Sequence, residues 1–89
     1  MRRDIKHVKT SRFRKHYQNL PRYVQQLADK SFELLKQNPG HPSLGFKKVN
    51  AYWAVRVGIN YRTLAFEKEG TYFWFWIGRH DEYMRLISS

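Results

Sequence analysis

The sequence contains no cysteine among its 89 residues. Neither a disulfide framework nor a thiolate metal site can therefore hold this small fold together, and the composition suits a reducing cytoplasm. The chain also has no apolar run near the roughly 20 residues that a membrane-spanning helix needs. Its N-terminus is basic but continues into the mixed segment Ile5–Lys9 rather than the apolar core of a signal peptide. We therefore expect a cytoplasmic protein.

Acidic residues are scarce, since seven Asp and Glu stand against seventeen Lys and Arg and leave a net charge of +10. This excess is larger than the solubility of a small domain requires. A polyanion such as a nucleic acid is the partner that the charge favours, and an acidic protein segment is a second one. The remaining alternative is a solvated basic surface that has no partner.

Aromatic residues make up 17% of the chain and apolar residues 42%. Each buried aromatic side chain removes roughly 150 to 250 Å² from water, so the chain can close one hydrophobic core in spite of its length. We expect a single domain over residues 1–89.

The first half of the chain predicts a short strand over residues 4–9 and then two helices. Thr10 and Ser11 offer capping hydroxyls for the first helix, and Pro21 suits the first turn of the second. Residues at helical spacing, apolar except for Ser31, define one face of each helix: Phe13, Tyr17 and Leu20 in the first, and Val24, Leu27, Ala28, Ser31, Leu34 and Leu35 in the second. The second helix is expected to end at residues 38–40.

From Phe46 onward the apolar period changes to two, which predicts a meander of three antiparallel strands. Turns are expected at residues 58–60 and 68–70. In the first strand one face carries Trp53, Val55 and Val57, and the other carries Tyr52, Ala54 and Arg56. In the last strand Phe73, Phe75 and Ile77 are expected to alternate with Tyr72, Trp74 and Trp76.

Residues 81–89 predict one last helical turn. The predicted fold class is α+β: an N-terminal strand and a helical hairpin are packed on one face of an antiparallel β-meander sheet, and the other face is the expected working surface.

Four short strings occur in this order and together resemble the RelE/ParE toxin superfamily: Leu44–Val49, Trp53–Gly58, Tyr61–Phe66 and Ile77–Tyr83. The resemblance covers nearly the whole chain and implies a RelE-like fold. It also implies the toxin of a type II toxin–antitoxin system, which a cognate antitoxin neutralises. Members of this superfamily are mainly ribonucleases that cut mRNA, often on the ribosome, or inhibitors of DNA gyrase.

The leading interpretation is a metal-independent mRNA endonuclease that needs no cofactor and acts on mRNA, with the ribosome as a further partner. One alternative is a ParE-like inhibitor of DNA gyrase, which would share the fold and leave RNA intact. The other is a non-catalytic module that binds nucleic acid, which rests on the charge of +10 alone.

Metal-free cleavage of RNA requires that the 2′-hydroxyl lose its proton, that the charge on phosphorus be stabilised and that the leaving 5′-oxygen gain a proton. We predict Arg62, His80 and Tyr83 as the catalytic residues. Arg62 follows Tyr61 as in the superfamily's Tyr-Arg strand motif, and the resemblance implies that it holds the scissile phosphate. The alternative is a surface arginine paired with Glu67 or Glu69.

A free histidine side chain has a pKa near neutrality, and His80 is expected where the last strand ends and a loop begins, so this residue type at this place suits general acid or base catalysis. The matching place holds a histidine in YafQ-like and YoeB-like ribonucleases of the superfamily. Tyr83 follows His80 by three residues, which departs from the usual spacing of the superfamily's terminal aromatic residue. Tyr83 either stacks on a base or donates a proton, or it is a core residue that seats the tail with Leu86.

Four further cations are predicted to bind substrate: Lys47, Lys48, Arg56 and Arg79. Because side chains alternate along a strand, only one of the two lysines is expected to face the groove.

Other polar and aromatic residues are interpreted as structural or solvated. Asp81 and Glu82 are adjacent and diverge in direction, so no metal site is predicted there, and one of them is expected to orient His80 or an arginine. The remaining histidines are expected at the surface, and the two tryptophans of the last strand are expected in the core: His7, His16 and His41, and Trp74 and Trp76.

Overall fold

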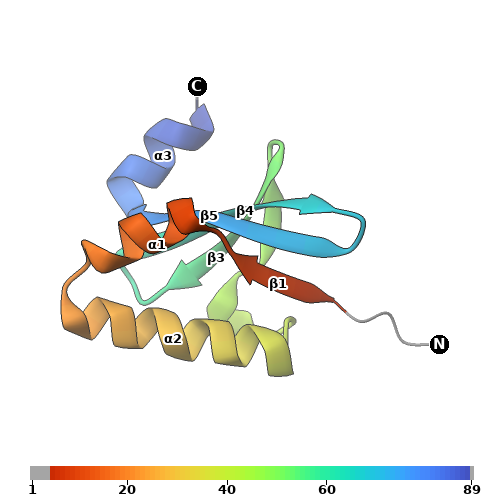
Figure 1. Ribbon diagram of the computed structural model, residues 1–89, viewed down its shortest axis with the longest axis horizontal. Coiled ribbons are helices and arrows are strands. Elements are labelled where there is room, and N and C mark those ends of the chain that lie inside the picture. Colours follow the sequence, from red (N-terminus) through yellow and green to blue (C-terminus); the bar gives the residue numbers. More distant parts are fainter. Residues whose placement is uncertain (1–4, 89) are drawn as a thin grey trace.

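A computed structural model describes residues 5–88 of the chain, and in it a mixed five-stranded sheet carries helices on both faces (Figure 1). The elements follow one another as β1 (Lys6–Lys9), α1 (Ser11–Gln18), α2 (Arg22–Gln37), the short 3₁₀ helix η1 (Pro42–Leu44), β2 (Lys47–Val49), β3 (Tyr52–Val57), β4 (Tyr61–Lys68), β5 (Thr71–Arg79) and α3 (His80–Ser88). The predicted α+β class and the N-terminal strand are confirmed, although Asp4 lies outside the described residues.

The strand order in the sheet is β1-β5-β4-β3-β2. Strands β2 to β5 pair antiparallel, whereas β1 pairs parallel to β5. The expected three-stranded meander is wrong in one respect, because the period-two stretch from Phe46 to Val57 forms two strands. Asn50 adopts a positive φ of 56° in the turn between them, which folds β2 back on β3.

Helix α1 begins where the sequence predicts it. The Thr10 Oγ1 atom accepts a hydrogen bond from the Phe13 backbone N–H at 3.2 Å, and its hydroxyl donates to the Trp74 carbonyl oxygen at 2.8 Å. One hydroxyl therefore caps α1 and ties it to β5.

Helix α2 starts after Pro21 and packs on the same face of the sheet as α1. Its buried residues are Val24, Ala28, Phe32 and Leu35. Two details of the predicted apolar face are wrong: Phe32 was not assigned to it, and Leu27 is 36% exposed.

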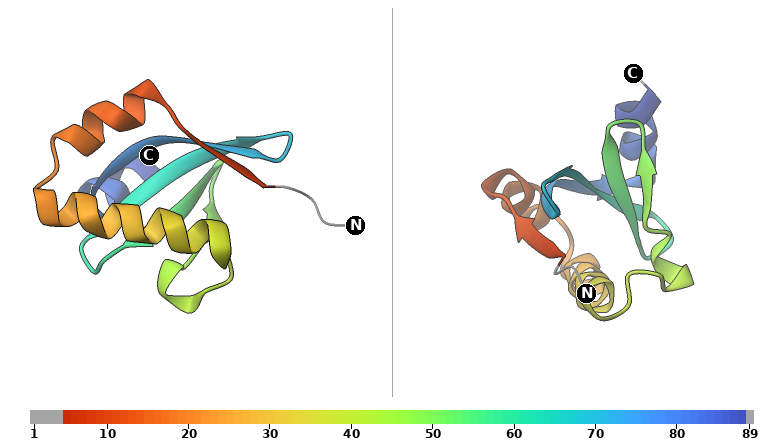
Figure 2. Two further views of the ribbon diagram at one scale, coloured as in Figure 1. Left: turned by 60° about the horizontal axis from the view of Figure 1, so that its bottom comes forward. Right: turned by 90° about the vertical axis from the view of Figure 1, so that its right-hand side faces the viewer.

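Two hydrophobic clusters lie on opposite faces of the sheet. The larger one lies under α1 and α2 and includes Phe13, Phe32, Val55, Val57, Trp74 and Ile77. The smaller one lies under α3 and consists of Ala54, Leu64, Trp76 and Tyr83. Figure 2 shows α3 on the side of the sheet away from α2. The expected single helical turn is thus a nine-residue helix, and it covers part of the face that was expected to be open.

The expected alternation along β5 breaks at a β-bulge. Leu64 pairs with Trp76 but the next residue, Ala65, pairs with Trp74, so Phe75 is the extra residue of β5. A bulge turns two successive side chains toward one face. Trp76 therefore joins Phe75 on the α3 side, and Ile77 joins Trp74 under α1 and α2. Both tryptophans are buried, as the sequence predicts.

None of the helices within residues 5–88 has the length and apolar character needed to cross a membrane.

His7 on β1 is half-buried, which corrects its assignment as a surface residue. Its Nδ1 atom accepts a hydrogen bond of 3.0 Å from Trp74 Nε1, and its ring stacks on the rings of Tyr72 and Trp74. Burial lowers the pKa of His7, and the positive charge of Lys36 lowers it further. Both effects favour the neutral form of the His7 ring in the folded state.

Because the pKa of His7 is lower in the folded than in the unfolded chain, the folded state is stabilised above the ordinary histidine pKa of about 6.5 and loses this contribution as the pH falls. We expect the melting temperature to fall between about pH 7 and about pH 5 more steeply in the wild type than in His7→Gln. Thermal unfolding followed by circular dichroism measures this, with His16→Gln as the control. Parallel curves for the wild type and His7→Gln would contradict the assignment.

Candidate functional site

Two arginines lie directly opposite each other on neighbouring strands. Arg56 of β3 pairs with Arg62 of β4 in the antiparallel register. Both belong to the face of the sheet that carries Ala54 and Leu64, which is the α3 side. Like charges placed directly opposite each other on a sheet are destabilising. The pair thus creates a local surplus of positive charge that an anion would relieve.

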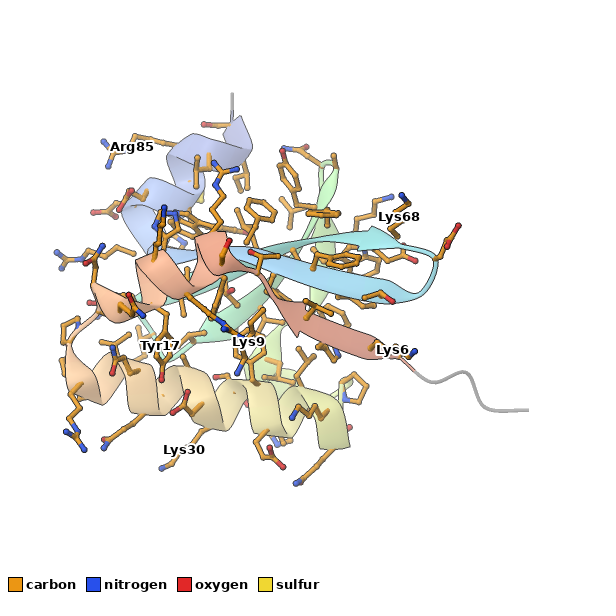
Figure 3. The ribbon with its side chains drawn as sticks, viewed as in Figure 1. Lys6, Lys9, Tyr17, Lys30, Lys68 and Arg85 are labelled. Carbon is orange, nitrogen blue, oxygen red and sulfur yellow. The ribbon has the colours of Figure 1, made fainter. Side chains whose placement is uncertain are left out.

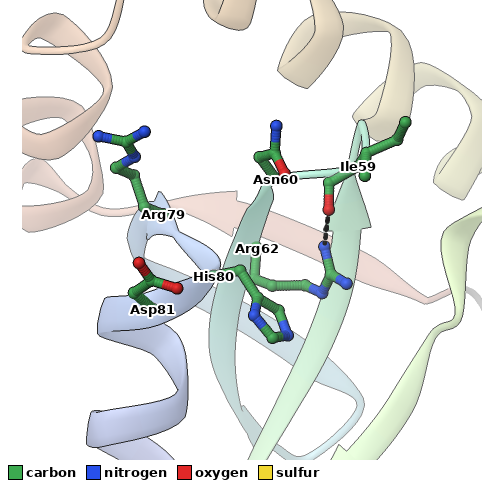
Figure 4. A pocket seen from close by; sticks show the side chains of 6 residues that line it. All are labelled: Ile59, Asn60, Arg62, Arg79, His80 and Asp81. Carbon is green, nitrogen blue, oxygen red and sulfur yellow. Dashed lines mark hydrogen bonds between the residues drawn. The ribbon is translucent and has the colours of Figure 1, made fainter.

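Arg62 is held by backbone carbonyls at the end of the sheet. Its Nη1 atom donates to the Tyr61 oxygen at 2.7 Å and to the Ile59 oxygen at 3.3 Å, so its side chain lies against the β3–β4 turn (Figure 4). The alternative of pairing with Glu67 or Glu69 is wrong, because among residues 5–88 Arg62 has no ion pair with either carboxylate.

Burial lowers the pKa of the Arg62 guanidinium, and the charge of Arg56 lowers it further, whereas Tyr83 acts in the opposite direction. An arginine stays charged in spite of such shifts. Burial and the charge of Arg56 both disfavour the charged form of Arg62, and a bound anion would favour it.

Gly45, which follows η1, leaves room for the other arginine. It adopts a φ of 52°, and a Cβ atom at this position would lie 3.0 Å from Nη2 of Arg56. The left-handed turn and the absent side chain thus let the Arg56 guanidinium lie against the backbone of the loop.

His80 is the first residue of α3, so a helix and not the expected loop begins there. Its backbone N–H donates to the Asn60 oxygen at 2.8 Å, which joins the start of α3 to the β3–β4 turn. The ring of His80 lies beside the Arg62 side chain in Figure 4. Its centroid is 5.7 Å from that of Tyr83.

A glycine close to His80 shapes this end of β5. Gly78 pairs with Arg62, and a Cβ atom on Gly78 would lie 2.5 Å from Cζ2 of Trp76. The buried indole of Trp76 therefore occupies the space beside Gly78, and it packs against the backbone of β5 two residues before His80.

Five of the seven predicted site residues line one pocket of about 300 Å³ between α3 and the strands. These are Lys47, Arg56, Arg62, His80 and Tyr83, and the rest of the wall is formed by Gly45, Val49, Ala54, Val55, Met84 and Ile87. A strongly cationic group of side chains thus surrounds a hollow that also holds an imidazole and a phenol.

A second hollow of about 270 Å³ lies next to the first and shares Arg62 and His80 with it. Its other lining residues are Ile59, Asn60, Arg79 and Asp81. In Figure 4 the Arg79 side chain points away from Arg62 and His80, so Arg79 lies at the margin.

Lys48 is the one predicted site residue that lines neither hollow. It pairs with Trp53, which packs against the cluster under α1 and α2, whereas Lys47 pairs with Ala54 of the cluster under α3. The expectation that only one of the two lysines faces the groove is confirmed, and that lysine is Lys47.

Tyr83 is 6% exposed and packs against Ala54, Leu64 and Trp76, so it is a core residue of the smaller cluster. It also lines the pocket beside His80. The interpretation of Tyr83 as a core residue thus agrees with its packing, although Leu86, the expected neighbour, is 45% exposed. Its role in base stacking or proton donation stays a prediction.

The sequence analysis did not assign Gly45 and Asn60 to the site, although both residues line its hollows from turns. The Leu-Gly-Phe string contained the only signal for Gly45, since glycine at the end of a short helix favours a left-handed turn. Within residues 5–88 no three His, Cys, Asp or Glu side chains gather in an arrangement that could hold a metal ion.

Comparison with known proteins finds similarity at the level of structure only. No protein-family model matches the chain, and no curated protein matches it in sequence. A chain of the RelB–RelE antitoxin–toxin complex from Methanococcus jannaschii is 17% identical, with a TM-score of 0.69 over 89% of this chain and 96% of that one. A chain of the toxin–antitoxin complex RelBE2 from Mycobacterium tuberculosis is also 17% identical, with a TM-score of 0.61 over 86% and 99%.

A double mutant of the E. coli toxin RelE in the free state is 11% identical and reaches a TM-score of 0.66 over 96% of this chain and 94% of that chain. At these identities the likeness establishes the fold. The chain has the RelE-like fold that the sequence resemblance implied.

The opposed arginines predict that an anion stabilises the folded protein. Inorganic phosphate at about four times its dissociation constant should contribute about 1 kcal/mol, or about 4–8 °C in melting temperature for a domain of this size. We expect the melting temperature in phosphate to exceed that in chloride of equal ionic strength by this amount, both in the wild type and in Lys48→Gln. Arg56→Gln and Arg62→Gln should lose most of it. An equal rise in all four proteins would contradict a specific anion site.

Proposed function

We propose that this chain, which has the RelE-like fold, is the toxin of a type II toxin–antitoxin system and cleaves mRNA through its own side chains. The observation that carries the proposal is the opposed pair Arg56 and Arg62, which lies in one pocket with His80. A phosphodiester is the anion that such a site suits, because its charge increases in the transition state of cleavage.

In the proposed reaction the 2′-oxygen of a ribose attacks the adjacent phosphorus while the bond from phosphorus to the 5′-oxygen breaks. The proton of the 2′-hydroxyl passes to a base, and the 5′-oxygen receives a proton from an acid. The products are a 2′,3′-cyclic phosphate and a 5′-hydroxyl. This step needs no water and no oxidant or reductant.

The two arginines are proposed to bind the nonbridging oxygens of the phosphate. A guanidinium presents several N–H donors in one plane, so it matches two phosphate oxygens at once. Arg62 is already fixed by its hydrogen bonds to the carbonyls of Ile59 and Tyr61, which reduces the cost of ordering it when the substrate binds.

His80 is proposed as the residue that moves a proton, because imidazole exchanges protons near neutral pH. Tyr83 and Lys47 are the other proton-carrying groups of the pocket. Tyr83 is proposed to hold the His80 ring in place through packing and to offer its hydroxyl as a second donor. Arg79 and Lys48 are proposed to contact more distant parts of the RNA.

The ribosome is proposed as the setting of the reaction. The chain carries 17 Lys and Arg residues, and of those within residues 5–88 only Lys47, Arg56 and Arg62 line the main pocket. A large cationic surface outside the pocket suits ribosomal RNA as a docking partner. Such a toxin acts in the cytoplasm, where mRNA is translated.

An antitoxin is proposed as the second partner. Two of the structures that share the fold belong to antitoxin–toxin complexes, from Methanococcus jannaschii and Mycobacterium tuberculosis. The charge of +10 favours an acidic segment that folds as it docks and covers the pocket.

Expression of the chain without an antitoxin is predicted to arrest growth and to shorten transcripts. Arg62→Ala and His80→Ala should remain folded and lose at least about 100-fold in cleavage, since one donor to the charge of a transition state contributes about 10²–10³ in rate. Lys48→Ala is the matched comparison, because Lys48 lies on the same sheet but outside both hollows and is proposed to contact only distant parts of the RNA, so it should lose far less cleavage than either variant. Primer extension on transcripts from induced cells measures the cleavage.

Intact transcripts together with broken chromosomal DNA would contradict the ribonuclease and favour an inhibitor of DNA gyrase. Normal growth of cells that contain the folded protein would favour a non-catalytic nucleic-acid-binding module.

A further inference from the structure

Four aromatic side chains gather on the sheet face that carries the two arginines, toward the β4–β5 hairpin. They form an aromatic patch that consists of Tyr52, Phe66, Phe73 and Phe75. Phe66 follows Arg62 by four residues on β4, so strand alternation places both on one face. At about 3.3 Å per residue they are about 13 Å apart along the strand.

The rings of the patch form one continuous group. Phe66 stacks on Phe73 with a centroid distance of 5.1 Å and an interplanar angle of 17°, and it lies 6.1 Å from Phe75. Tyr52 meets Phe75 edge-on at 5.2 Å. Phe73 and Phe75 are two residues apart and share this face by strand alternation, and the bulge adds Trp76 to the same side.

Two of the four rings of the patch are exposed to solvent although aromatic side chains are usually buried, and Phe73 and Phe75 are half-buried. Phe66 is 41% exposed and Tyr52 is 36% exposed, and the cluster under α3 includes neither of them. A contiguous group of exposed rings on a soluble domain marks a binding surface.

Cations border the patch. The Arg12 guanidinium of α1 lies over the Phe75 ring, 5.9 Å from its centroid. Lys68 follows Phe66 by two residues on β4 and therefore shares its face, and Lys6 pairs with Thr71 beside it. Figure 3 shows both lysines toward the end of the sheet where the β4–β5 hairpin closes.

The acidic residue of β4 does not share this surface. Within the described strands β4 and β5, Glu67 is the only carboxylate, and it pairs with Tyr72, whose ring packs on the opposite face under α2. The exposed rings are thus bordered by positive charge on their own face, which favours an anionic partner that has flat apolar groups.

We propose that the aromatic patch is a stacking platform for the bases of single-stranded RNA, separate from the pocket that holds the scissile phosphate. Single-stranded nucleic acids bind where aromatic rings stack on bases and nearby cations contact the backbone. The proposal rests on the proposed function in that the same RNA strand is held at both places. Arg12, Lys6 and Lys68 contact its phosphates, and Phe66 and Tyr52 stack on its bases.

The test is a binding titration with a labelled 2′-O-methyl RNA of about 12 nucleotides at about 0.1 M salt, a length within the site sizes of single-strand binders. This RNA has no free 2′-hydroxyl and stays uncut. Phe66→Ser and Tyr52→Ser should each weaken binding about tenfold, which is the range of a lost base stack. Tyr23→Ser is the matched control, because Tyr23 is 63% exposed on α2, and it should bind as the wild type does. Thermal unfolding verifies that each variant is folded.

A second RNA of the same length, in which abasic positions replace the bases, separates stacking from charge. The wild type should bind it about tenfold more weakly than the complete RNA, and Phe66→Ser should bind both alike. Equal affinity of the wild type for both RNAs, or unchanged binding by both patch variants, would overturn the platform. Variants that keep RNA binding and lose the antitoxin would show instead a surface for a peptide.

These outcomes are distinct from failure of the proposed function. Transcript cleavage in cells by a protein that binds both RNAs alike would retain the ribonuclease and remove the platform. If the protein binds the complete RNA more tightly than the abasic RNA but leaves transcripts intact, the platform is retained and the ribonuclease is contradicted.

Discussion

The register between β3 and β4 is the constraint on which the site depends. It sets Arg56 opposite Arg62 on one face, while Val55 opposite Thr63 and Trp53 opposite Ala65 face α1 and α2. A slip by one residue would turn every side chain of a strand to the other face and bury an arginine under the helices. The apolar cluster therefore enforces a like-charge contact that the arginines alone would not make.

The bulge on β5 determines how α3 packs on the face of the sheet that carries Arg56 and Arg62. It turns Trp76 toward α3, so the helix finds an apolar surface of Ala54, Leu64 and Trp76 on which Tyr83 packs. Because His80 begins this helix and its N–H donates to the Asn60 oxygen of the β3–β4 turn, the imidazole is held beside Arg62 at the end of the sheet. Precise placement of this kind is what acid–base chemistry on a phosphate needs.

Strand alternation places Phe75 on the same face as Phe73, and both rings lie with Phe66 toward the β4–β5 hairpin. The face thus divides into a cationic end with Arg56 and Arg62, a middle covered by α3, and an aromatic end toward the hairpin. An RNA strand presents both phosphates and bases, so its chemistry matches both uncovered ends.

Much of this arrangement could be predicted from the order of residues. The alternation of side chains along a strand predicts that Arg56 points to the face opposite that of Val55 and Val57. It also predicts that only one of Lys47 and Lys48 faces the groove. The capping hydroxyl of Thr10 marked the start of α1. These features depend on local geometry, which sequence spacing reports directly.

The features that could not be predicted depend on contacts between distant residues. The bulge arises from pairing between β4 and β5, and no local signal separates Trp76 from the alternation of its neighbours. The half-buried position of His7 follows from the parallel pairing of β1 with β5, which brings Trp74 Nε1 to its ring. The full length of α3 depends on the surface that the bulge creates.

The central claim is that the cationic pocket cleaves RNA by attack of a neighbouring 2′-oxygen. Analysis of the ends of transcripts cut in induced cells tests it most directly. The account predicts a 2′,3′-cyclic phosphate or its 3′-phosphate hydrolysis product on the upstream fragment and a 5′-hydroxyl on the downstream fragment. Fragments with a 5′-phosphate and a 3′-hydroxyl would show that water attacked the phosphorus, and would contradict it.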